Sequence, residues 1–282
     1  MSIEPAVAMR TAAFDWDYEV QVALPASYGV MPDKAYPVLW LTDGPFLLPL
    51  AVGLLNTLVV GGLAPEMIIV GVGCASEAGA TEFGRRRSID FAPPGKSILF
   101  DGPGGDYFRK LGVPEGGAQQ ADDLLAFLVD EVRPSLSQTY RMSDDHGLLG
   151  HSGGGMFASY ALFARPGAFR RYIIGSPSSN AADRAAFRLE SDYAAANADL
   201  EADVFFGAGE LEIGKLSLAA WGIVSAPVLM AETLLLRQYP SLKVTTRIFP
   251  GKDHFSVLAD IIGEGVRAVW ADKVDLSKRP FS

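Results

Sequence analysis

Three residues at fixed spacing offer the clearest chemistry in this sequence. Gly150, Ser152 and Gly154 occupy the constant positions of a G-x-S-x-G pattern, which places a nucleophilic serine on a sharp turn between a strand and a helix. Glycines two positions to either side let the two chain segments pass closely around a strained serine backbone. The apolar run 147–150 and the helix-forming stretch 156–163 supply the strand and the helix. The pattern therefore predicts a serine nucleophile.

Two other interpretations of the same glycines are weaker. The chain contains 30 glycines, so a glycine-rich helix start without chemistry is the main alternative. A dinucleotide-binding loop would need G-x-G-x-x-G at the opening of a helix, and the sequence has no such run at a predicted helix start. In a nucleophile elbow, the N–H of Gly153 would point at a developing oxyanion, at the positive end of the following helix.

A serine nucleophile needs a general base, and the chain has three histidines. His151 lies within the pattern, where its side chain is expected to point away from the serine, and His146 is too close along the chain to reach the end of the strand. His254 lies in the loop 250–256, between the last predicted strand and the last predicted helix. In a parallel sheet this loop opens at the same edge as Ser152, so His254 is the predicted base.

The base in turn needs an acidic partner that orients its ring. In chain order this acid follows the serine and precedes the histidine. Glu210 and Glu212 both meet that condition, directly after a predicted buried strand. Side chains two positions apart point in different directions, so only one of them is expected to face His254. The spacing leaves the choice between the two glutamates open.

These residues must be positioned by a sheet, and the apolar patterns predict one. Strand patterns occupy 16–24, 37–41, 67–72, 147–150, 171–176, 204–208 and 244–249. Helical patterns occupy 46–64, 122–133, 156–163, 181–196, 221–236 and 257–270, with Pro134 just past the second of them. Alternating strands and helices predict an α/β fold with a mostly parallel central sheet and helices on both faces, as a single domain over 1–282. Segments 79–116, which looks irregular, and 213–230 are candidate lids or walls of the site.

Composition and charge limit the functional classes. The net charge is −9 and the only basic cluster is the arginines 85–87, so nucleic acid is not an expected partner. The single cysteine, Cys74, excludes an internal disulfide and is interpreted as a small buried residue. The uncharged stretch 46–64 contains Pro49 and three glycines, which favours a helix buried against the sheet over a membrane span. The first 17 residues lack the pattern of a signal peptide. A cytoplasmic protein without membrane association is therefore predicted.

Together the motifs resemble those of the esterase D and enterochelin-esterase branch of the α/β-hydrolase superfamily. The similar segments are 36–44, 87–94, 140–141, 150–154, 169–172, 176–178, 209–212 and 251–255. The resemblance implies the α/β-hydrolase fold. It also implies that the acid is the glutamate three positions after the glycine that ends its strand, which is Glu212.

One position departs from the family. The second oxyanion donor is expected just after the pair Asp43-Gly44, but that residue is Pro45, which has no N–H. Phe46 is therefore the expected donor beside Gly153, with Gly44 or no second donor as alternatives. The loss of one donor costs about 10²–10³ in rate, so this departure raises the prospect of a slow enzyme.

Asp43, Gly44, Arg87 and His151 are the candidate substrate-binding residues. An arginine at position 87 suits an anionic or catechol-bearing group on the substrate. The alternative is an ion pair between Arg87 and Asp90 that pins the loop.

The leading hypothesis is a serine carboxylic-ester hydrolase with an acyl-enzyme on Ser152, supported by His254 and Glu212. It would act on a small-molecule ester as a monomer or homodimer, with no metal and no cofactor. Siderophore esters, small acyl esters and thioesters are candidate substrates. The alternatives are a weakly active or non-catalytic scaffold that binds a ligand or partner, which Pro45 motivates, and an acyltransferase or thioesterase.

Overall fold

A mostly parallel sheet organises the chain. The computed structural model describes residues 1–96, 100, 105–110, 112–113, 115, 119–275 and 277. Within these residues nine strands form one sheet in the order β1-β3-β5-β4-β6-β7-β8-β9, with β2 also paired to β3. The strands are β1 (Ser2–Ile3), β2 (Val7–Met9), β3 (Tyr18–Leu24), β4 (Tyr36–Leu41), β5 (Ile68–Gly73), β6 (Met142–His151), β7 (Arg171–Gly175), β8 (Asp203–Gly209) and β9 (Lys243–Phe249).

The parallel part of the sheet runs from β5 through β4, β6, β7 and β8 to β9. Strand β3 is antiparallel to β5, and β1 and β2 are antiparallel to β3. Every strand predicted from the apolar patterns is present. The two strands that were not predicted, β1 and β2, are two and three residues long and largely exposed, so they carry no apolar pattern.

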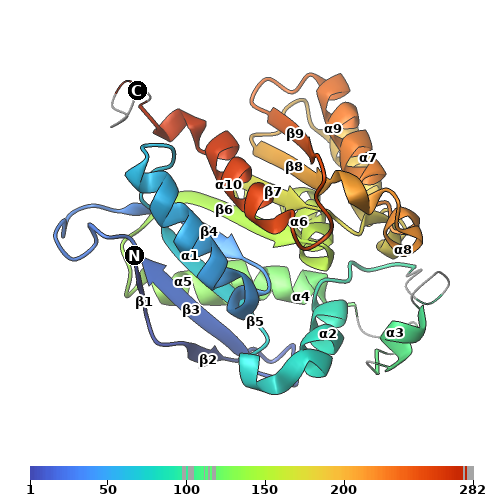
Figure 1. The fold of residues 1–282 in the computed structure, drawn as a ribbon, viewed down its shortest axis with the longest axis horizontal. Helices are drawn as coiled ribbons and strands as arrows, with labels where there is room; N and C mark the ends of the chain where they lie inside the picture. The colour runs from blue at the N-terminus through green and yellow to red at the C-terminus, as the bar shows by residue number, and fades with distance from the viewer. Residues whose placement is uncertain are drawn as a thin grey trace.

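Helices cover both faces of this sheet, as predicted (Figure 1). Helices α1 (Gly44–Val60) and α10 (Leu258–Val269) contact each other on one face, where Leu47, Leu55 and Ile261 join the core side chains Leu39 and Phe205. The stretch expected to be a helix buried against the sheet is therefore α1. The opposite face carries α4 (Ala121–Ala126), α6 (Gly153–Ala164), α7 (Ala185–Ala196) and α9 (Ser225–Arg237).

The topology gathers the predicted site residues at one edge. Asp43 follows β4, Ser152 follows β6, Glu212 lies just beyond β8, and His254 lies beyond β9. All four strands run parallel within the sheet. Ligands of open α/β sheets bind outside the carboxyl ends of the strands, and these four residues occupy that position.

The prediction of an irregular segment over 79–116 was wrong in its first part. Helix α2 (Gly79–Asp90) follows a 3₁₀ turn at Ser76–Ala78, and α3 (Gly105–Lys110) lies further on. The α2 sequence is too polar for an apolar stripe, but Glu82 pairs with Arg85 and Arg86 at 2.7 and 2.6 Å, the spacing that stabilises a helix surface. Residues 97–99, 101–104, 111, 114 and 116 of this segment lie outside the described residues.

The predicted helix end before Pro134 was also wrong. Helix α4 continues through a π-helical turn, Phe127–Val132, into α5 (Arg133–Ser137). Proline has no N–H to donate to an i−4 carbonyl. Because the preceding turn has already left the i→i−4 pattern, the helix accepts Pro134 without ending there.

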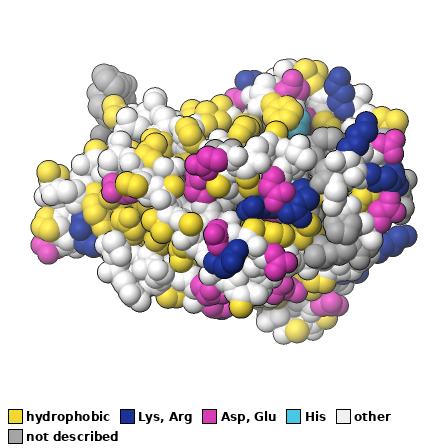
Figure 2. Space-filling model, turned by 90° about the horizontal axis from the view of Figure 1, so that it is seen from below, with side chains coloured by type: hydrophobic (Ala, Val, Ile, Leu, Met, Phe, Trp, Pro, Cys, Tyr) yellow, Lys and Arg dark blue, Asp and Glu magenta, His cyan; other side chains and the backbone are white. Residues whose placement is uncertain are grey.

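Charged side chains of both signs alternate on the surface. On the face in Figure 2, lysine and arginine side chains lie among aspartate and glutamate side chains and form no single basic area. One described stretch, Leu216–Arg237, is long and apolar enough to span a membrane, by length and composition only. A turn at 221–224 divides it into α8 (Leu216–Ala220) and α9, and Met230 and Leu234 of α9 lie in the core. The cytoplasmic location expected from the sequence stays a prediction.

Candidate active site

Ser152 lies on a strained turn between β6 and α6. Its backbone has φ 60° and ψ −119°, a region in which a side chain is unfavourable. A Cβ atom at Gly150 would collide with the carbonyl group of Gly154, and one at Gly154 would collide with the Thr42 hydroxyl. The two glycines of the pattern are therefore required by close contacts on both sides of the serine.

The backbone of Ser152 is held on three sides. Its N–H donates to the carbonyl of Gly175 at 2.9 Å, and its own carbonyl accepts from Met156 at 3.0 Å and from Ser178 at 3.2 Å. Among the described residues, no hydrogen-bond partner occurs for the N–H of Gly153. This group stands at the N-terminus of α6, where unpaired N–H groups bind anions.

His254 and Glu212 form a buried pair. Nδ1 of His254 donates to Oε1 of Glu212 at 2.5 Å. The other glutamate oxygen, Oε2, accepts from the N–H of Gly209 at 2.6 Å and from the Ser176 hydroxyl at 2.8 Å. Glu212 is 1% exposed. Both oxygens are thus used, and the carboxylate has one fixed orientation towards the imidazole.

The neighbouring glutamate contacts a different group. Oε2 of Glu210 accepts from the N–H of Gly251 at 2.9 Å, and the Glu210 side chain is exposed. Leu211 between them donates its N–H to the carbonyl of Lys252 at 3.0 Å. Glu210 therefore stabilises the loop that carries His254, whereas Glu212 contacts the imidazole itself.

Ser152 and His254 line one pocket of about 420 Å³. Within the described residues, no hydrogen bond joins the Ser152 hydroxyl to the His254 ring; such bonds often tighten only when substrate is bound. The wall is mainly apolar and aromatic, with contributions from Phe46, Phe83 and Trp221. The described residues that line it are Asp43, Phe46, Leu47, Phe83, Gly84, Arg87, Ser88, Phe108, His151, Ser152, Gly153, Met156, Ser178, Ala181, Leu218, Trp221, His254, Phe255 and Leu258. Both candidate wall segments, 79–116 and 213–230, therefore contribute side chains to the pocket.

Arg87 and Asp43 supply the charges in this wall. Nε and Nη2 of Arg87 donate to the two oxygens of Asp43 at 3.0 and 2.9 Å, and Nη2 lies 3.5 Å from the carbonyl of His151. The guanidinium also lies 5.5 Å from the ring centres of Phe83 and Phe91. The expected alternative, a pair between Arg87 and Asp90, is replaced by this bidentate pair, which joins α2 to the end of β4. Because its partner is a strand-end carboxylate 44 positions away, sequence spacing gave no sign of it.

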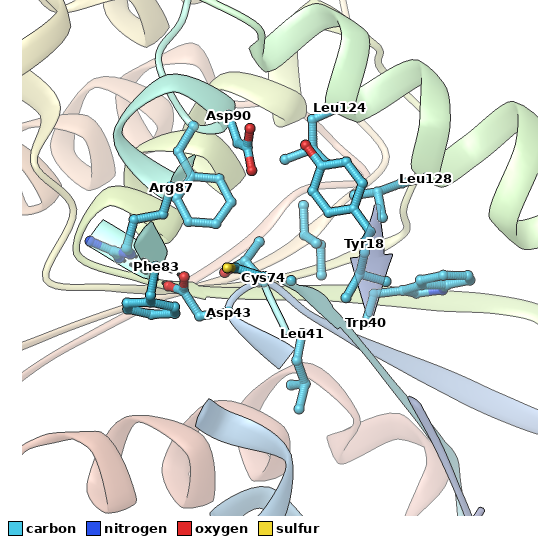
Figure 3. A pocket seen from close by; sticks show the side chains of 15 residues that line it. Tyr18, Trp40, Leu41, Asp43, Cys74, Phe83, Arg87, Asp90, Leu124 and Leu128 are labelled. Atoms are coloured by element: carbon cyan, nitrogen blue, oxygen red, sulfur yellow. Dashed lines mark hydrogen bonds and ion pairs between the residues drawn. The ribbon is translucent and has the colours of Figure 1, made fainter. Parts of the chain in front are cut away.

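Behind this ion pair lies a second, much smaller cavity of about 10 Å³. Figure 3 shows Asp43, Phe83 and Arg87 at one side of it, with Tyr18, Trp40, Leu124 and Leu128 across from them. Asp90 also faces this cavity, and burial raises the pKa of its carboxyl to about 8. Its Oδ1 has no hydrogen-bond partner among the described residues. The volume suits about one water molecule.

The second oxyanion donor is constrained by the first turn of α1. The N–H of Phe46 donates to the carbonyl of Asp43 at 3.0 Å, and the same carbonyl accepts from Leu47 at 3.0 Å. Asp43 has φ 52°, and Gly44 packs so closely on Gly71 that a Cβ atom would collide with its backbone. Phe46 lines the pocket beside Ser152, but its N–H already has a partner within the helix.

His151 and Cys74 complete the predicted residues. His151 is 6% exposed, and its Nε2 lies 2.8 Å from the backbone carbonyl of His254. Cys74 is buried, as predicted, and burial raises the pKa of its thiol. No group of three or more His, Cys, Asp or Glu side chains suited to a metal ion occurs in the described part of the chain.

Ser176 has no role among the predicted site residues, although 176–178 is one of the segments that carry the family resemblance. Its hydroxyl contacts Glu212, and its backbone has φ 41°. The resemblance of this segment was the only available signal, because a serine at a strand end has no distinctive spacing.

Comparisons with known proteins identify the family and the fold. The family model described as "Putative esterase" matches residues 11–245. The ferri-bacillibactin esterase BesA of Bacillus subtilis is 30% identical over 156 residues, which cover 52% of this chain and 49% of that protein. The siderophore enterobactin esterase of Emericella nidulans is 32% identical over 189 residues, which cover 62% of this chain and 60% of that protein. The matched part thus spans about half to three fifths of these relatives.

Solved structures match over nearly the whole chain. The siderophore hydrolase EstB from Aspergillus nidulans has a TM-score of 0.78 at 24% identity and covers 96% of both chains. The BES protein from Bacillus cereus has a TM-score of 0.76 at 23% identity and covers 95% of this chain and 94% of its own. At these identities the likeness establishes the fold, which is the α/β-hydrolase fold expected from the sequence.

Proposed function

The chain belongs to the esterase family whose model spans residues 11–245, and we propose that it is a serine carboxylic-ester hydrolase. The observation that carries the proposal is the arrangement around one pocket. Ser152 and His254 line it, and His254 Nδ1 is bonded at 2.5 Å to the buried carboxylate of Glu212. The nucleophile, the orienting acid and the base follow one another in the chain order of α/β-hydrolases.

In the proposed reaction, the Ser152 oxygen attacks the ester carbonyl while Nε2 of His254 accepts its proton. Glu212 holds the proton on Nδ1 and stabilises the imidazolium that forms. His254 then donates its proton to the leaving alkoxide, and the acyl group stays on Ser152. A water molecule, deprotonated by the same imidazole, attacks the acyl-enzyme and releases the acid.

The tetrahedral oxyanion requires N–H donors about 3 Å from its oxygen. The N–H of Gly153 is one, because no described group competes for it at the start of α6. We assign the second to Phe46, whose N–H would be shared with or released from the Asp43 carbonyl when substrate binds. Asp43 and Gly44 set the direction of this turn, and Arg87 fixes Asp43 through both of its oxygens.

The pocket supports an ester with an apolar or aromatic part and an anionic group. Phe46, Phe83, Phe108 and Trp221 provide the aromatic wall, and Arg87 provides the cation. The similar proteins from Bacillus subtilis and Emericella nidulans are esterases of siderophores by name. Siderophore-type esters are therefore the first substrates to assay.

The test uses a panel of p-nitrophenyl esters, a catecholate trilactone and a fluorophosphonate probe. The wild-type chain should hydrolyse members of the panel and take the probe on Ser152. Ser152→Ala should lower kcat at least about 10³-fold and keep the melting temperature of wild type. Labelling of another serine, or full turnover by Ser152→Ala, would reject Ser152 as the nucleophile.

One observation favours a second candidate, a scaffold that binds an ester but turns it over slowly. Pro45 offers no N–H, and the N–H of Phe46 is already bonded to Asp43. On this hypothesis the pocket would bind substrate with ordinary affinity and a low kcat. A binding titration with Ser152→Ala, compared with wild-type kcat, distinguishes the two functions.

A further inference from the structure

His151 is a buried titratable group that the proposed reaction does not use. It is the last residue of β6, directly before Ser152, and it is 6% exposed. Its Nε2 lies 2.8 Å from the backbone carbonyl oxygen of His254, and the two imidazole centres are 4.6 Å apart. The residue before the nucleophile therefore contacts the residue that carries the base.

The contact fixes the protonation of the ring. A carbonyl oxygen only accepts hydrogen bonds, so Nε2 of His151 carries the proton. Nδ1 has no partner among the described residues, and a Cβ atom at Gly175 would stand 3.0 Å from it. Burial holds the pKa of His151 well below its ordinary value, and the neighbouring His254 and Arg87 act in the same direction. The ring is a neutral donor with one proton in one place.

The loop that carries His254 has other supports, which act on the residues flanking His254. Gly251 donates to Glu210, Lys252 accepts from Leu211, and the Asp253 carboxylate accepts from Phe255 and Ser256. These contacts join the loop to the segment after β8 and to itself. Within the described residues, the bond from His151 is the one hydrogen bond between the elbow strand and the backbone of His254.

We infer that His151 is a positioning residue that sets the distance between the nucleophile and the base. Ser152 is covalently attached to it, and His254 is bonded to its side chain. The inference rests on the proposed function. It also replaces the substrate-binding role expected from the sequence, because the only proton of the buried ring is already committed to a carbonyl oxygen.

The two roles predict different kinetics. Loss of a substrate contact raises KM, whereas a misplaced base lowers kcat, and a displacement of about 1 Å costs on the order of 10²-fold in rate. His151→Gln places an amide N–H near the position of Nε2, and His151→Asn places it near Nδ1. We expect Gln to keep kcat within about threefold of wild type, and Asn and Leu to lower it roughly 10- to 100-fold with KM nearly unchanged.

A matched control is available on the same strand. His146 is also buried, and its Nδ1 accepts from the Trp40 indole N–H at 3.1 Å, away from the pocket. His146→Gln should leave kcat unchanged, whatever its effect on melting temperature. Equal kcat in His151→Asn and wild type, or a Gln variant no better than Asn, overturns the inference.

A measurement on the wild-type chain is independent of turnover and of the folding of any variant. With three histidines in the sequence, ¹⁵N spectra of histidine-labelled protein resolve each ring. We expect His151 as the Nε2–H tautomer, with a proton protected from exchange. A His151 proton on Nδ1, or one that exchanges freely, overturns the inference. An inactive wild type with the expected tautomer would instead reject the proposed esterase function.

Discussion

The Ser176 hydroxyl lies 2.8 Å from Oε2 of Glu212, the carboxylate oxygen that does not contact His254. Ser176 is fully buried and has a backbone φ of 41°. The residue after β7 thus contacts one oxygen of the carboxylate, and the imidazole contacts the other. A side chain outside the described lining of the pocket thus helps to orient the proposed acid, together with the N–H of Gly209.

We predict that Ser176→Ala lowers kcat roughly tenfold, because the carboxylate loses one of its donors and can rotate away from the imidazole. KM should change little. The control is Ser159→Ala, since Ser159 is equally buried but donates within α6, to the carbonyl of Gly155. Steady-state kinetics with one activated ester suffice. Equal losses in the two variants would mean that the effect is general destabilisation.

Replacement of the two glutamates after β8 should have clearly different effects on kcat. Glu212→Gln should lower kcat by about 10³ or more, because an amide no longer fixes the imidazole tautomer or stabilises its cation. Glu210→Gln removes only a contact to the N–H of Gly251 and should cost less than about tenfold. Each variant replaces one carboxylate oxygen with an amide nitrogen, so kcat values at one pH compare them directly. The reverse ranking would make Glu210 the acid.

Replacements of Arg87 and Asp43 should have strongly non-additive effects on the free energy of unfolding. The Asp43 side chain is 6% exposed, so Arg87→Ala leaves a buried carboxylate without its bidentate partner and should cost about 3 kcal/mol. The double variant with Asp43→Asn should recover part of this loss. Chemical denaturation of wild type, the two single variants and the double variant measures this non-additivity. Arg85→Ala, which removes a more exposed pair with Glu82, is the control.

The Arg87→Ala variant also tests whether the pocket recognises a negatively charged group on the substrate. If Arg87 binds an anionic group, Arg87→Ala raises KM for acidic esters and leaves neutral esters unchanged. A uniform fall in kcat for both kinds of ester would assign Arg87 a purely structural role through Asp43.

Asp90 should make stability fall with rising pH. Burial raises the folded-state pKa of this carboxyl to about 8, from an ordinary value of 3.8. Between these values the unfolded chain is ionised and the folded chain keeps its proton, so unfolding releases a proton and stability declines from about pH 4 to pH 8. Asp90→Asn removes this slope. The melting temperature of the variant minus that of wild type should therefore rise by roughly 5 °C or more from pH 5 to pH 9.

The control is Asp130→Asn. Asp130 is an exposed carboxylate whose pKa is lowered by its pair with Arg165. Its titration lies below this pH window, so melting curves of Asp130→Asn should parallel those of wild type. Parallel curves for wild type and Asp90→Asn would contradict the assignment of a protonated Asp90.

The parts of the fold that were predictable are those in which local sequence and burial agree. The strand at 204–208 is continuously apolar because both its faces are covered, and β8 is buried along its whole length. The turn at Ser152 was predictable because the glycine spacing marks it locally, and a Cβ atom at Gly150 would collide with Gly154, four residues on. The collision that excludes a Cβ atom at Gly154 is with Thr42, 112 positions away, and was not predictable. Helix α2 was missed because ion pairs and not an apolar stripe stabilise it, and the relevant spacing of Glu82 and Arg86 was attributed to a loop.

The contacts that were not predictable join distant positions. The bond from His151 to His254 spans 103 positions, and the pair of Arg87 with Asp43 spans 44. A histidine inside the G-x-S-x-G pattern gives no indication that its ring reaches a loop after the last strand. Only the parallel order β6-β7-β8-β9 brings these ends to the same edge.

The strained backbone of Ser152 lowers the stability of the fold, and the proposed reaction depends on the side chain at this position. At φ 60° and ψ −119° a glycine would be relieved of a cost of about 1–3 kcal/mol that the serine bears. Under selection for heat resistance alone, Ser152→Gly would therefore be enriched, and each such survivor would have lost its proposed nucleophile. On the proposed function, the retention of a serine at this turn therefore depends on selection for catalysis.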